Sequence, residues 1–509
     1  MNGAQTNPYG VLRKVTSANR AELSRRAKAG VAMRLAPGIY VENAAASPQE
    51  VTRHHLFAIV AMIWPDAVLC GRTALDGGVP RDATFYLADP TRRRPTPLKL
   101  PGITIVPSPG PGALPGDMAM PNGLFISGPA RSLVENATLR GRPALFRAGS
   151  RAVEDRIDEM ARAGGAGRIR EILTQLDVIA PSFDRESVAF VRARLAALLG
   201  SFEHGTLKVD SRRLEARLSG EPFDQRRLDL LGGLVEVLGP RAPRPAPMLG
   251  DAARWTWEPF FEAYFSNFIE GTEFGVDEAR GIAIDHIIPE ARPADAHDVA
   301  ATYQLANDPR DRVRIPHSGE ELIGVLRDRH RLLMAARPEK HPGELKTRMN
   351  FAGGYQFVEP DLVQGTLSRG FDVLNGLSDP FARAVAMMVL ITECHPFDDG
   401  NGRVARLTVN AELSVAGQVR IIIPTVYRND YLASLAGLSR GVGRGESLIA
   451  VLEFAQRWTG EVDWQSFDKA HRTLQGVNAY VDPGVADASG IRLMFPSRFD
   501  ETGPHRLEG

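Results

Sequence analysis

The alternation of hydrophobic and polar positions in the first hundred residues predicts a small unit of helices and a hairpin. Residues 17–30 match a short helix that starts at a Ser or Asn cap and ends at a glycine. Residues 31–41, VAMRLAPGIYV, place two extended runs around an Ala-Pro-Gly turn, which is typical of a hairpin. Ser47 and Glu50 then form a capping box that opens an apolar helix. Helix, hairpin and helix in this order predict a winged-helix domain over residues 1–75.

The following segment, residues 76–235, changes from a strand pattern to a helical one. Between 80 and 127, Pro and Gly separate short apolar runs of strand length. From about 129 to 200, apolar positions recur with the helical period. These patterns predict an α+β region that becomes helical. Residues 236–250 contain four prolines and predict a semi-rigid linker.

Helical patterns dominate residues 251–480, and residues 481–509 form a Pro- and Gly-rich tail with a weak pattern. A chain of 509 residues is expected to contain about three domains. The predicted fold class is therefore multidomain: a winged helix with an α+β domain, and then a mainly α-helical domain that carries a β-hairpin flap.

The composition fits a soluble globular protein, with 43% hydrophobic and 24% charged residues. The longest uninterrupted apolar stretch, Leu56–Trp64, is far shorter than the roughly 20 residues that span a bilayer. The first ten residues are polar and have no signal-peptide core. Two cysteines exclude a disulfide framework and a four-cysteine zinc site. We therefore expect a cytoplasmic protein with no membrane partner, either monomeric or a homo-oligomer.

The charge balance hides an asymmetry, although Lys and Arg total 61 and Asp and Glu also total 61. Residues 1–100 contain 14 basic and 7 acidic residues, so this part carries a charge of +7 and the remainder −7. A basic part of this kind suits a polyanion, and DNA is a candidate partner of the N-terminal domain. The run Arg92–Arg94 fits either a solvated loop or a contact with a phosphate backbone.

One segment concentrates the residues that phosphate chemistry needs: HPFDDGNGRVAR at 395–406. Its glycines permit positive φ, and successive N–H groups in such a loop can form an anion-binding nest. Because a helical pattern resumes near 402, the loop leads into a helix N-terminus, which also favours phosphate. The candidate nucleotide-binding residues are Asp398, Gly400, Asn401, Gly402, Arg403 and Arg406.

Two further residues of this loop supply reactive groups. A neutral His395 imidazole can accept a proton near pH 7, and the Asp399 carboxylate is a hard ligand suited to Mg²⁺ on phosphates. The alternative is a capped loop in which His395 is a satisfied core residue. A lone histidine would favour that alternative, but eight specified positions in twelve favour phosphoryl or nucleotidyl transfer.

This run resembles the signature of the Fic family, HxFx(D/E)GNGRxxR, and matches it at every specified position. The resemblance extends over about 255–465. It implies transfer of AMP from ATP to a Ser, Thr or Tyr hydroxyl of a target protein. By the same resemblance, His395 is the general base and Asp399 holds Mg²⁺ on the α- and β-phosphates. The phosphates are held by Asn401, Gly402 and Arg403, with Arg406 on the γ-phosphate.

The resemblance also implies a flap and an inhibitory helix. Residues 349–358 would form a hairpin flap that takes the target segment by strand addition, although an ordinary exposed hairpin also fits. Residues 266–271, SNFIEG, match the motif (S/T)xxxE(G/N) of Fic proteins with an N-terminal inhibitory helix, expected here at about 258–271. Its residues are Ser266, Glu270 and Gly271, and the implied inhibitory pair is Glu270 with Arg406.

The N-terminal part has a second resemblance. GRTALDGGVPRDATF at 71–85, together with RLAPGIYV, resembles abortive-infection (AbiEi-like) antitoxins and related regulators over about residues 10–130. In that family a winged-helix domain precedes a mixed domain. The alternatives to an autoinhibited adenylyltransferase are therefore a DNA-binding regulator that uses the nucleotide domain as a sensor, a self-inhibited toxin, and an enzyme that removes AMP.

Overall fold

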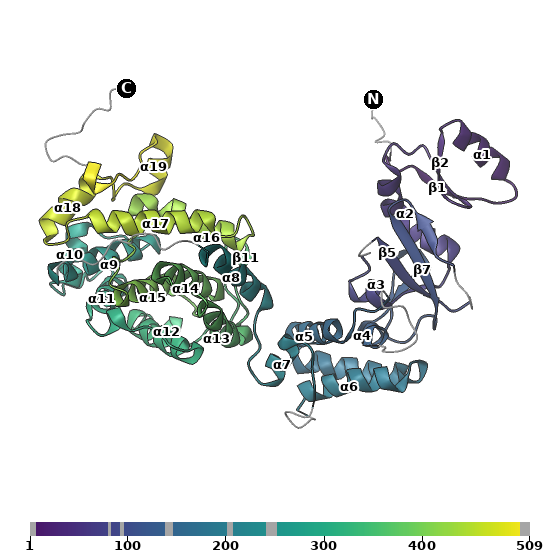
Figure 1. Ribbon diagram of the computed structural model, residues 1–509, viewed down its shortest axis with the longest axis horizontal. Helices are drawn as coiled ribbons and strands as arrows, with labels where there is room; N and C mark the ends of the chain where they lie inside the picture. Colours follow the sequence, from purple (N-terminus) through teal and green to yellow (C-terminus); the bar gives the residue numbers. More distant parts are fainter. Residues whose placement is uncertain are drawn as a thin grey trace. The chain divides into compact units, whose positions relative to one another are not determined.

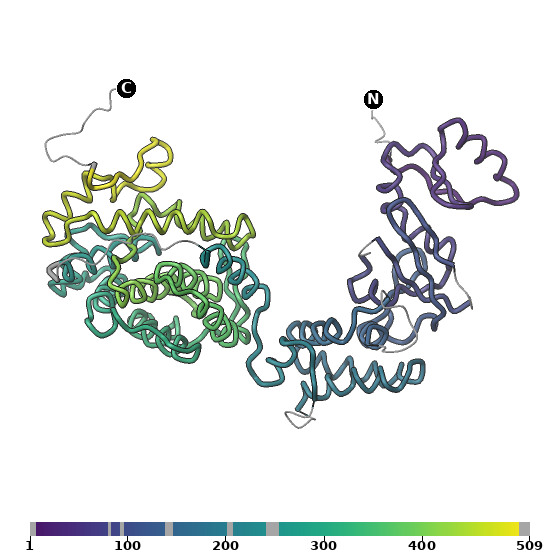
Figure 2. The backbone as a smooth tube through the Cα atoms, viewed as in Figure 1, coloured from purple at the N-terminus to yellow at the C-terminus, as the bar shows by residue number. Residues whose placement is uncertain are grey.

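In a computed structural model the chain divides into two compact units, residues 1–220 and 221–509 (Figure 1). The structure describes residues 7–79, 83–91, 96–137, 146–200, 207–240 and 252–498, which are coloured along the backbone in Figure 2. The run Arg92–Arg94, most of the expected linker (241–250) and the tail from 499 onward lie outside these ranges.

A three-stranded antiparallel sheet opens the first unit, in the order β1-β3-β2. Its elements are β1 (Val11–Lys14), α1 (Arg20–Lys28), β2 (Ala32–Ala36) and β3 (Ile39–Glu42), and α2 (Pro48–Ile63) follows. The predicted hairpin is confirmed by the β2–β3 pairing, and the predicted capping box is present at Ser47 and Glu50. Strand β1 has no buried residue, so the hydrophobic pattern of the sequence did not predict it. The winged-helix arrangement itself stays a prediction.

A six-stranded mixed sheet follows, in the order β6-β7-β5-β4-β9-β8. Its strands are β4 (Val68–Leu69), β5 (Thr84–Asp89), β6 (Leu98–Leu100), β7 (Ile103–Pro109), β8 (Met118–Ala119) and β9 (Phe125–Ile126). The pairs β5–β7 and β4–β9 are parallel, with Thr84 opposite Thr104 in the first. One buried cluster contains Val41 of β3, Ile59 of α2 and Phe85 of β5. Residues before and after position 75 therefore share a hydrophobic core.

The predicted helical part of the first unit is present. Its helices are α3 (Gly71–Leu75), α4 (Pro129–Ala137), α5 (Ser150–Ile179), α6 (Arg185–Leu198) and α7 (Arg212–Leu218). In α6 the predicted apolar stripe is buried at Val188, Val191 and Leu195. These side chains pack with α4, α5 and α7 in a separate cluster.

The second unit is mainly helical, as predicted, and its described residues contain one β-hairpin. Its helices are α8 (Gln225–Leu238), α9 (Trp257–Ile269), α10 (Val276–Ala283), α11 (Pro293–Asn307), α12 (Gly319–Leu333), α13 (Val363–Leu374), α14 (Pro380–Cys394), α15 (Asn401–Val415), α16 (Arg428–Ser439), α17 (Glu446–Glu461), α18 (Phe467–Gly476) and α19 (Pro483–Ser489). The hairpin consists of β10 (Phe351–Ala352) and β11 (Tyr355–Gln356).

Helix α14 lies at the centre of this unit. Nearly all of its side chains are buried, and they pack in one cluster with α8, α12, α13 and α15. Two ends of the unit differ from expectation: α8 continues through Leu238, so the first residues of the expected linker are helical, and α19 lies within the expected tail. Within the described ranges, no helix combines the length and the apolar character that crossing a bilayer requires.

Candidate active site

The signature residues form a tight connection between α14 and α15. Helix α14 ends at His395, which adopts the left-handed conformation with φ 46° and ψ 61°. Gly400 is also left-handed (φ 73°) and precedes the first turn of α15. A β-carbon at Gly400 would lie 3.0 Å from the sulfur of Met334, so both the turn and the packing favour glycine here. The connection thus brings the N-terminus of α15 next to the end of α14, as the sequence predicted.

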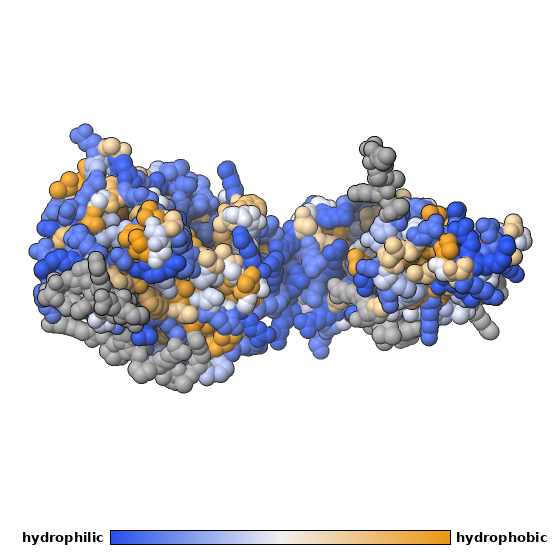
Figure 3. All heavy atoms as spheres, turned by 90° about the horizontal axis from the view of Figure 1, so that it is seen from above, coloured by the Kyte–Doolittle hydropathy of each residue, from blue (hydrophilic) through white to orange (hydrophobic). Residues whose placement is uncertain are grey.

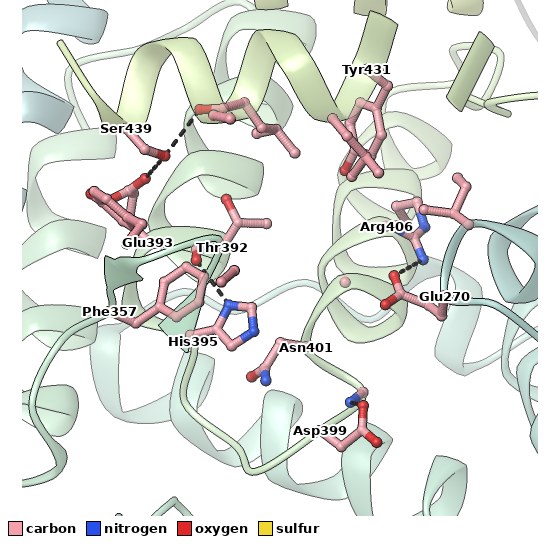
Figure 4. A pocket seen from close by; sticks show the side chains of 18 of the residues that line it. Glu270, Phe357, Thr392, Glu393, His395, Asp399, Asn401, Arg406, Tyr431 and Ser439 are labelled. Carbon is pink, nitrogen blue, oxygen red and sulfur yellow. Dashed lines mark hydrogen bonds and ion pairs between the residues drawn. The ribbon is translucent and has the colours of Figure 1, made fainter. Parts of the chain in front are cut away.

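The His395 imidazole is fixed on one side and free on the other. Its Nδ1 lies 3.1 Å from the carbonyl oxygen of Thr392, and its ring stacks on Phe357 at 3.8 Å. Burial lowers the pKa of His395 to about 4, so the ring is neutral near pH 7. Figure 4 shows the second ring nitrogen pointing away from Thr392 toward the cavity. A neutral imidazole with a free nitrogen can accept a proton there.

Asp398 and Asp399 lie side by side in the loop but have different partners. One Asp399 oxygen accepts a hydrogen bond from the Gly400 N–H (2.7 Å), and the other lies 3.7 Å from the Lys340 ammonium. The Asp398 carboxylate pairs with Nδ1 of His341 at 2.9 Å.

Asp399 is the residue of this loop that could bind Mg²⁺. The residues that the structure describes contain no group of three or more His, Cys, Asp and Glu placed to hold a metal. One partly exposed carboxylate does not make a cage of protein ligands. It does fit Mg²⁺, which usually binds one or two carboxylates together with waters and substrate phosphates. Asp399 would hold such an ion.

Two predicted nucleotide-binding side chains are hydrogen-bonded or paired with other protein groups. The Asn401 amide binds both the N–H and the C=O of Phe397, each at 2.9 Å, and so closes the loop. Arg403 forms a buried ion pair with Asp298 (2.8 Å) and donates to the side chain of Asn267 (3.2 Å). Arg403 does not line the cavity. A contact of its guanidinium with phosphate stays a prediction, and it would require the pair with Asp298 to open.

Arg406 is held by the end of the predicted inhibitory helix. Its Nη2 lies 2.6 Å from Oε1 of Glu270, its Nε donates to the Ser266 hydroxyl at 2.9 Å, and its Nη2 also donates to the Ser266 carbonyl at 3.0 Å. Burial alone would lower the pKa of Arg406, but the adjacent Glu270 carboxylate keeps it raised. Helix α9 ends at Ile269, and Gly271 follows with φ 88°. Glu270, directly after α9, therefore contacts Arg406 as predicted, and Ser266 in the last turn of α9 contacts the same guanidinium.

The predicted flap is present as the β10–β11 hairpin, with Gly353 and Gly354 at its tip in left-handed conformations. Arg227 of α8 supports it, because its Nη2 donates to the carbonyl of Gln356 at 2.5 Å. The same arginine pairs with Glu393 at 3.0 Å, and Glu393 accepts from the hydroxyl of Tyr355 at 2.6 Å. A chain of polar contacts thus connects α8, the flap and the end of α14.

These elements enclose a cavity of about 450 Å³. The signature loop, the flap, the end of α9 and one face of α16 line it, and Figure 4 shows Glu270 and His395 on opposite sides. The α16 side is largely apolar, with Leu432, Leu435 and Ala436. Of the predicted site residues, those at the cavity wall are Glu270, His395, Asp398, Asp399, Gly400, Asn401, Gly402 and Arg406. The cavity lining does not include Ser266, Gly271 or Arg403.

His330 of α12 supports the loop and was not predicted. Its ring stacks on Phe397 at 3.9 Å, its Nδ1 accepts from the Gly343 N–H (2.8 Å), and its Nε2 therefore donates to the Asp399 carbonyl at 3.2 Å. Burial lowers the pKa of His330 to about 4. Its position in the helical pattern of α12 gave no signal that distinguishes it from an ordinary core residue.

The comparisons with known proteins concern the second unit. The family model of the Fic/DOC family matches residues 323–413. Protein adenylyltransferase fic-1 of Caenorhabditis elegans is 26% identical over 181 residues, which cover 35% of this chain and 36% of the relative. Protein adenylyltransferase Fic of Drosophila erecta is 26% identical over 220 residues, which cover 41% of this chain and 42% of the relative. The match thus spans less than half of the length of these relatives.

Solved structures of Fic proteins are also similar. Fic-1 of C. elegans (residues 134–508) is 19% identical with a TM-score of 0.34, covering 61% of this chain and 86% of that one. A Fic domain-containing signaling protein of Bacteroides thetaiotaomicron is 21% identical with a TM-score of 0.33, covering 53% and 98%. Residues 323–413, which contain the flap, α14 and most of α15, thus match the model of the Fic/DOC family.

Proposed function

We propose that this protein transfers AMP from ATP to a Ser, Thr or Tyr hydroxyl of a target protein. One observation carries the proposal: the neutral His395 imidazole and the N-terminus of α15 line the same cavity. The first can accept a proton, and the second can bind phosphate. The matched relatives are named protein adenylyltransferases, which supports the same activity.

In the proposed reaction the free ring nitrogen of His395 takes the proton of the target hydroxyl. The hydroxyl oxygen attacks the α-phosphorus of ATP, the bond to the β-phosphate oxygen breaks, and pyrophosphate leaves. The N–H groups at the start of α15, from Asn401 to Arg403, face the phosphates, where backbone donors and the helix dipole stabilise negative charge. Mg²⁺ held by Asp399 would neutralise part of the phosphate charge. Once freed from Glu270, Arg406 binds the γ-phosphate with its two-pronged guanidinium.

The contact of Glu270 with Arg406 supports autoinhibition as part of the proposal. The carboxylate occupies the guanidinium and places negative charge where the γ-phosphate would lie. A misplaced triphosphate fails the in-line geometry, and an error of about 1 Å can reduce a rate roughly 100-fold. Ser266 and Gly271 serve this inhibition by holding Arg406 and by ending α9 before Glu270.

The test is incorporation of label from α-labelled ATP into protein by the full chain. The Glu270→Gly variant is expected to label itself or proteins of a lysate strongly, and His395→Ala in that background should abolish the signal. Label incorporated equally with and without His395 would contradict the proposal. Loss of label from previously modified protein would instead support AMP removal as the main activity.

A second proposed function, DNA binding by the first unit, rests on the charges around α1. Arg13 and Arg26 both pair with Glu42 at 2.9 Å. Four further basic side chains are exposed, and none has an acidic partner among the described residues: Arg20, Arg25, Lys28 and Arg34. The surface at this end of the unit is mostly hydrophilic (Figure 3). Unneutralised cations in this number suit a phosphate backbone.

Binding to duplex DNA, measured by electrophoretic shift at several salt concentrations, tests this second function. Replacing Arg20, Arg25 and Lys28 with Gln is expected to weaken binding and to flatten its salt dependence by about one phosphate contact per residue. The variant Lys469→Gln, in the second unit, is the matched control. Equal shifts by both variants would contradict a role of α1.

A further inference from the structure

The carbonyl groups at the end of α14 and in the loop that follows it need hydrogen-bond donors from other parts of the chain. His395 is a non-glycine residue with positive φ, a conformation that persists only where the surrounding structure holds it. The last carbonyls of α14 also lack partners within the helix. The segment from Cys394 to Phe397 must therefore find its hydrogen-bond donors elsewhere.

Those donors come from the chain just before the flap. The Lys346 ammonium donates to the carbonyl of Cys394 (3.2 Å), and the Lys346 backbone N–H donates to the carbonyl of Pro396 (2.8 Å). The Asn350 amide donates to the carbonyls of Phe397 (3.0 Å) and, more weakly, His395 (3.4 Å). Two residues thus contact four consecutive carbonyl oxygens.

Lys346 and Asn350 also hold each other. The ammonium donates to the Asn350 side-chain oxygen at 2.6 Å, which fixes the amide so that its NH₂ group faces the loop. Lys346 is only 4% exposed. Burying an ammonium group costs free energy unless its N–H groups donate hydrogen bonds. The hydrogen bonds of Lys346 to the loop therefore explain a buried lysine at this position better than packing does.

We propose that Lys346 and Asn350 are positioning residues for the transfer reaction: they set the backbone of residues 394–397 and thereby the place of the His395 imidazole. Phe357, which follows the same flap, stacks on that imidazole, so both ends of the flap segment fix the base. The proposal rests on the proposed AMP transfer for its kinetic consequence. Its structural consequence, the place and environment of the His395 ring, does not depend on that activity.

The pKa of His395 depends on the charges around it, so it can be measured as a test that a general loss of stability would not affect. Burial is the main cause of the low pKa of His395; the Lys346 ammonium lowers it further, whereas Glu270 and Asp399 raise it. Burial also lowers the pKa of Lys346 to about 8, which leaves the ammonium mostly protonated at pH 7. Removing this charge should therefore raise the pKa of His395, while an arginine should keep it.

The experiment compares Lys346→Met, Lys346→Arg and Asn350→Ala, each in the Glu270→Gly full chain, with Lys469→Met as surface control. Lys346→Met and Asn350→Ala are expected to lower kcat for label incorporation by about 100-fold with unchanged KM for ATP, because the base is misplaced. Lys346→Arg should retain most of the rate. Unchanged kcat in both of the first two variants would overturn the proposal.

A pH titration of the histidine rings by NMR, with the His395 signal identified by its loss in His395→Asn, gives the second measurement. Lys346→Met is expected to raise the pKa of His395 and Lys346→Arg to leave it in place; a pKa that does not move in Lys346→Met overturns the proposal. If Glu270→Gly incorporates no label, the proposed transfer fails and the titration still decides on positioning. Thermal unfolding checks that each variant folds. If Lys346→Met does not fold, the kcat of Asn350→Ala decides in its place, because that variant removes a donor to the loop without removing a charge.

Discussion

A β-carbon at Gly402 would lie 2.2 Å from Oε1 of Glu270, so glycine at position 402 is what lets this carboxylate reach Arg406. The same β-carbon would lie 3.0 Å from Nη1 of Arg406. Glycine at this position also permits close approach of a phosphate to the backbone. In this chain it also makes room for the residue that we propose excludes the phosphate.

The first prediction follows from this contact. Gly402→Ala should push Glu270 away from Arg406 and cost about 1.5 kcal/mol of unfolding free energy through the lost charge-assisted contact. The gain in helix propensity from alanine is the same whether or not Glu270 is present, so it cancels in a double-mutant cycle. The cycle combines Gly402→Ala with Glu270→Ala, and denaturant unfolding measures all four proteins. Equal effects of Gly402→Ala in both backgrounds would refute the steric coupling.

The second prediction concerns Ser266, whose hydroxyl accepts from Nε of Arg406. Ser266→Ala removes one charge-assisted hydrogen bond, worth about 1.5 kcal/mol or roughly a tenfold change in the population of the closed contact. Label incorporation from α-labelled ATP should therefore rise above wild type but stay below Glu270→Gly. Ser439→Ala, which removes a hydroxyl from the other side of the cavity, is the control. Incorporation at the wild-type level would show that the carboxylate alone holds Arg406.

The sequence predicted the parts of this site that are contiguous along the chain. The backbone of the segment from His395 to Arg406 could be predicted from its own residues, because its glycines and asparagine determine the turn and a helix begins within it. The flap and the inhibitory helix were implied by the resemblance to the Fic family, because each corresponds to a short contiguous segment, 349–358 and 266–271.

The missing parts are contacts between distant segments. Arg403 was expected to face the same ligand as Arg406, but Asp298 of α11 takes its guanidinium, and nothing near Arg403 in the sequence indicates that partner. His330 contacts Asp399, 69 residues later in the chain, and Lys346 contacts Cys394, 48 residues later. Neither residue could be distinguished by the hydrophobic pattern of its neighbours from a polar residue without a role in the site.

The third prediction is a pH dependence. Because burial lowers the pKa of His395 to about 4, its basic form persists down to pH values well below the ordinary histidine pKa of about 6.5. Protonation at low pH removes the base, so the labelling rate of Glu270→Gly should be level from pH 8 to about 5.5 and fall only below that range. Initial rates in buffers of constant ionic strength give the profile. A half-maximal rate near pH 6.5 would place the His395 ring in a solvated environment instead.

The last prediction concerns the connection between α8 and the flap. Arg227 and Glu393 are both nearly fully buried, so Arg227→Met leaves a buried carboxylate without its cation and should cost about 3 kcal/mol. The flap also loses the donor to the Gln356 carbonyl, so amide exchange over residues 351–357 should accelerate more than exchange in α15. Arg226→Met, an exposed neighbour, is the matched control. Adding Glu393→Gln to Arg227→Met should recover much of the stability but not the slow exchange of the flap, because the carboxylate is neutralised while the Gln356 carbonyl still lacks its donor. Recovery of both would mean that Arg227 acts on the flap only through Glu393.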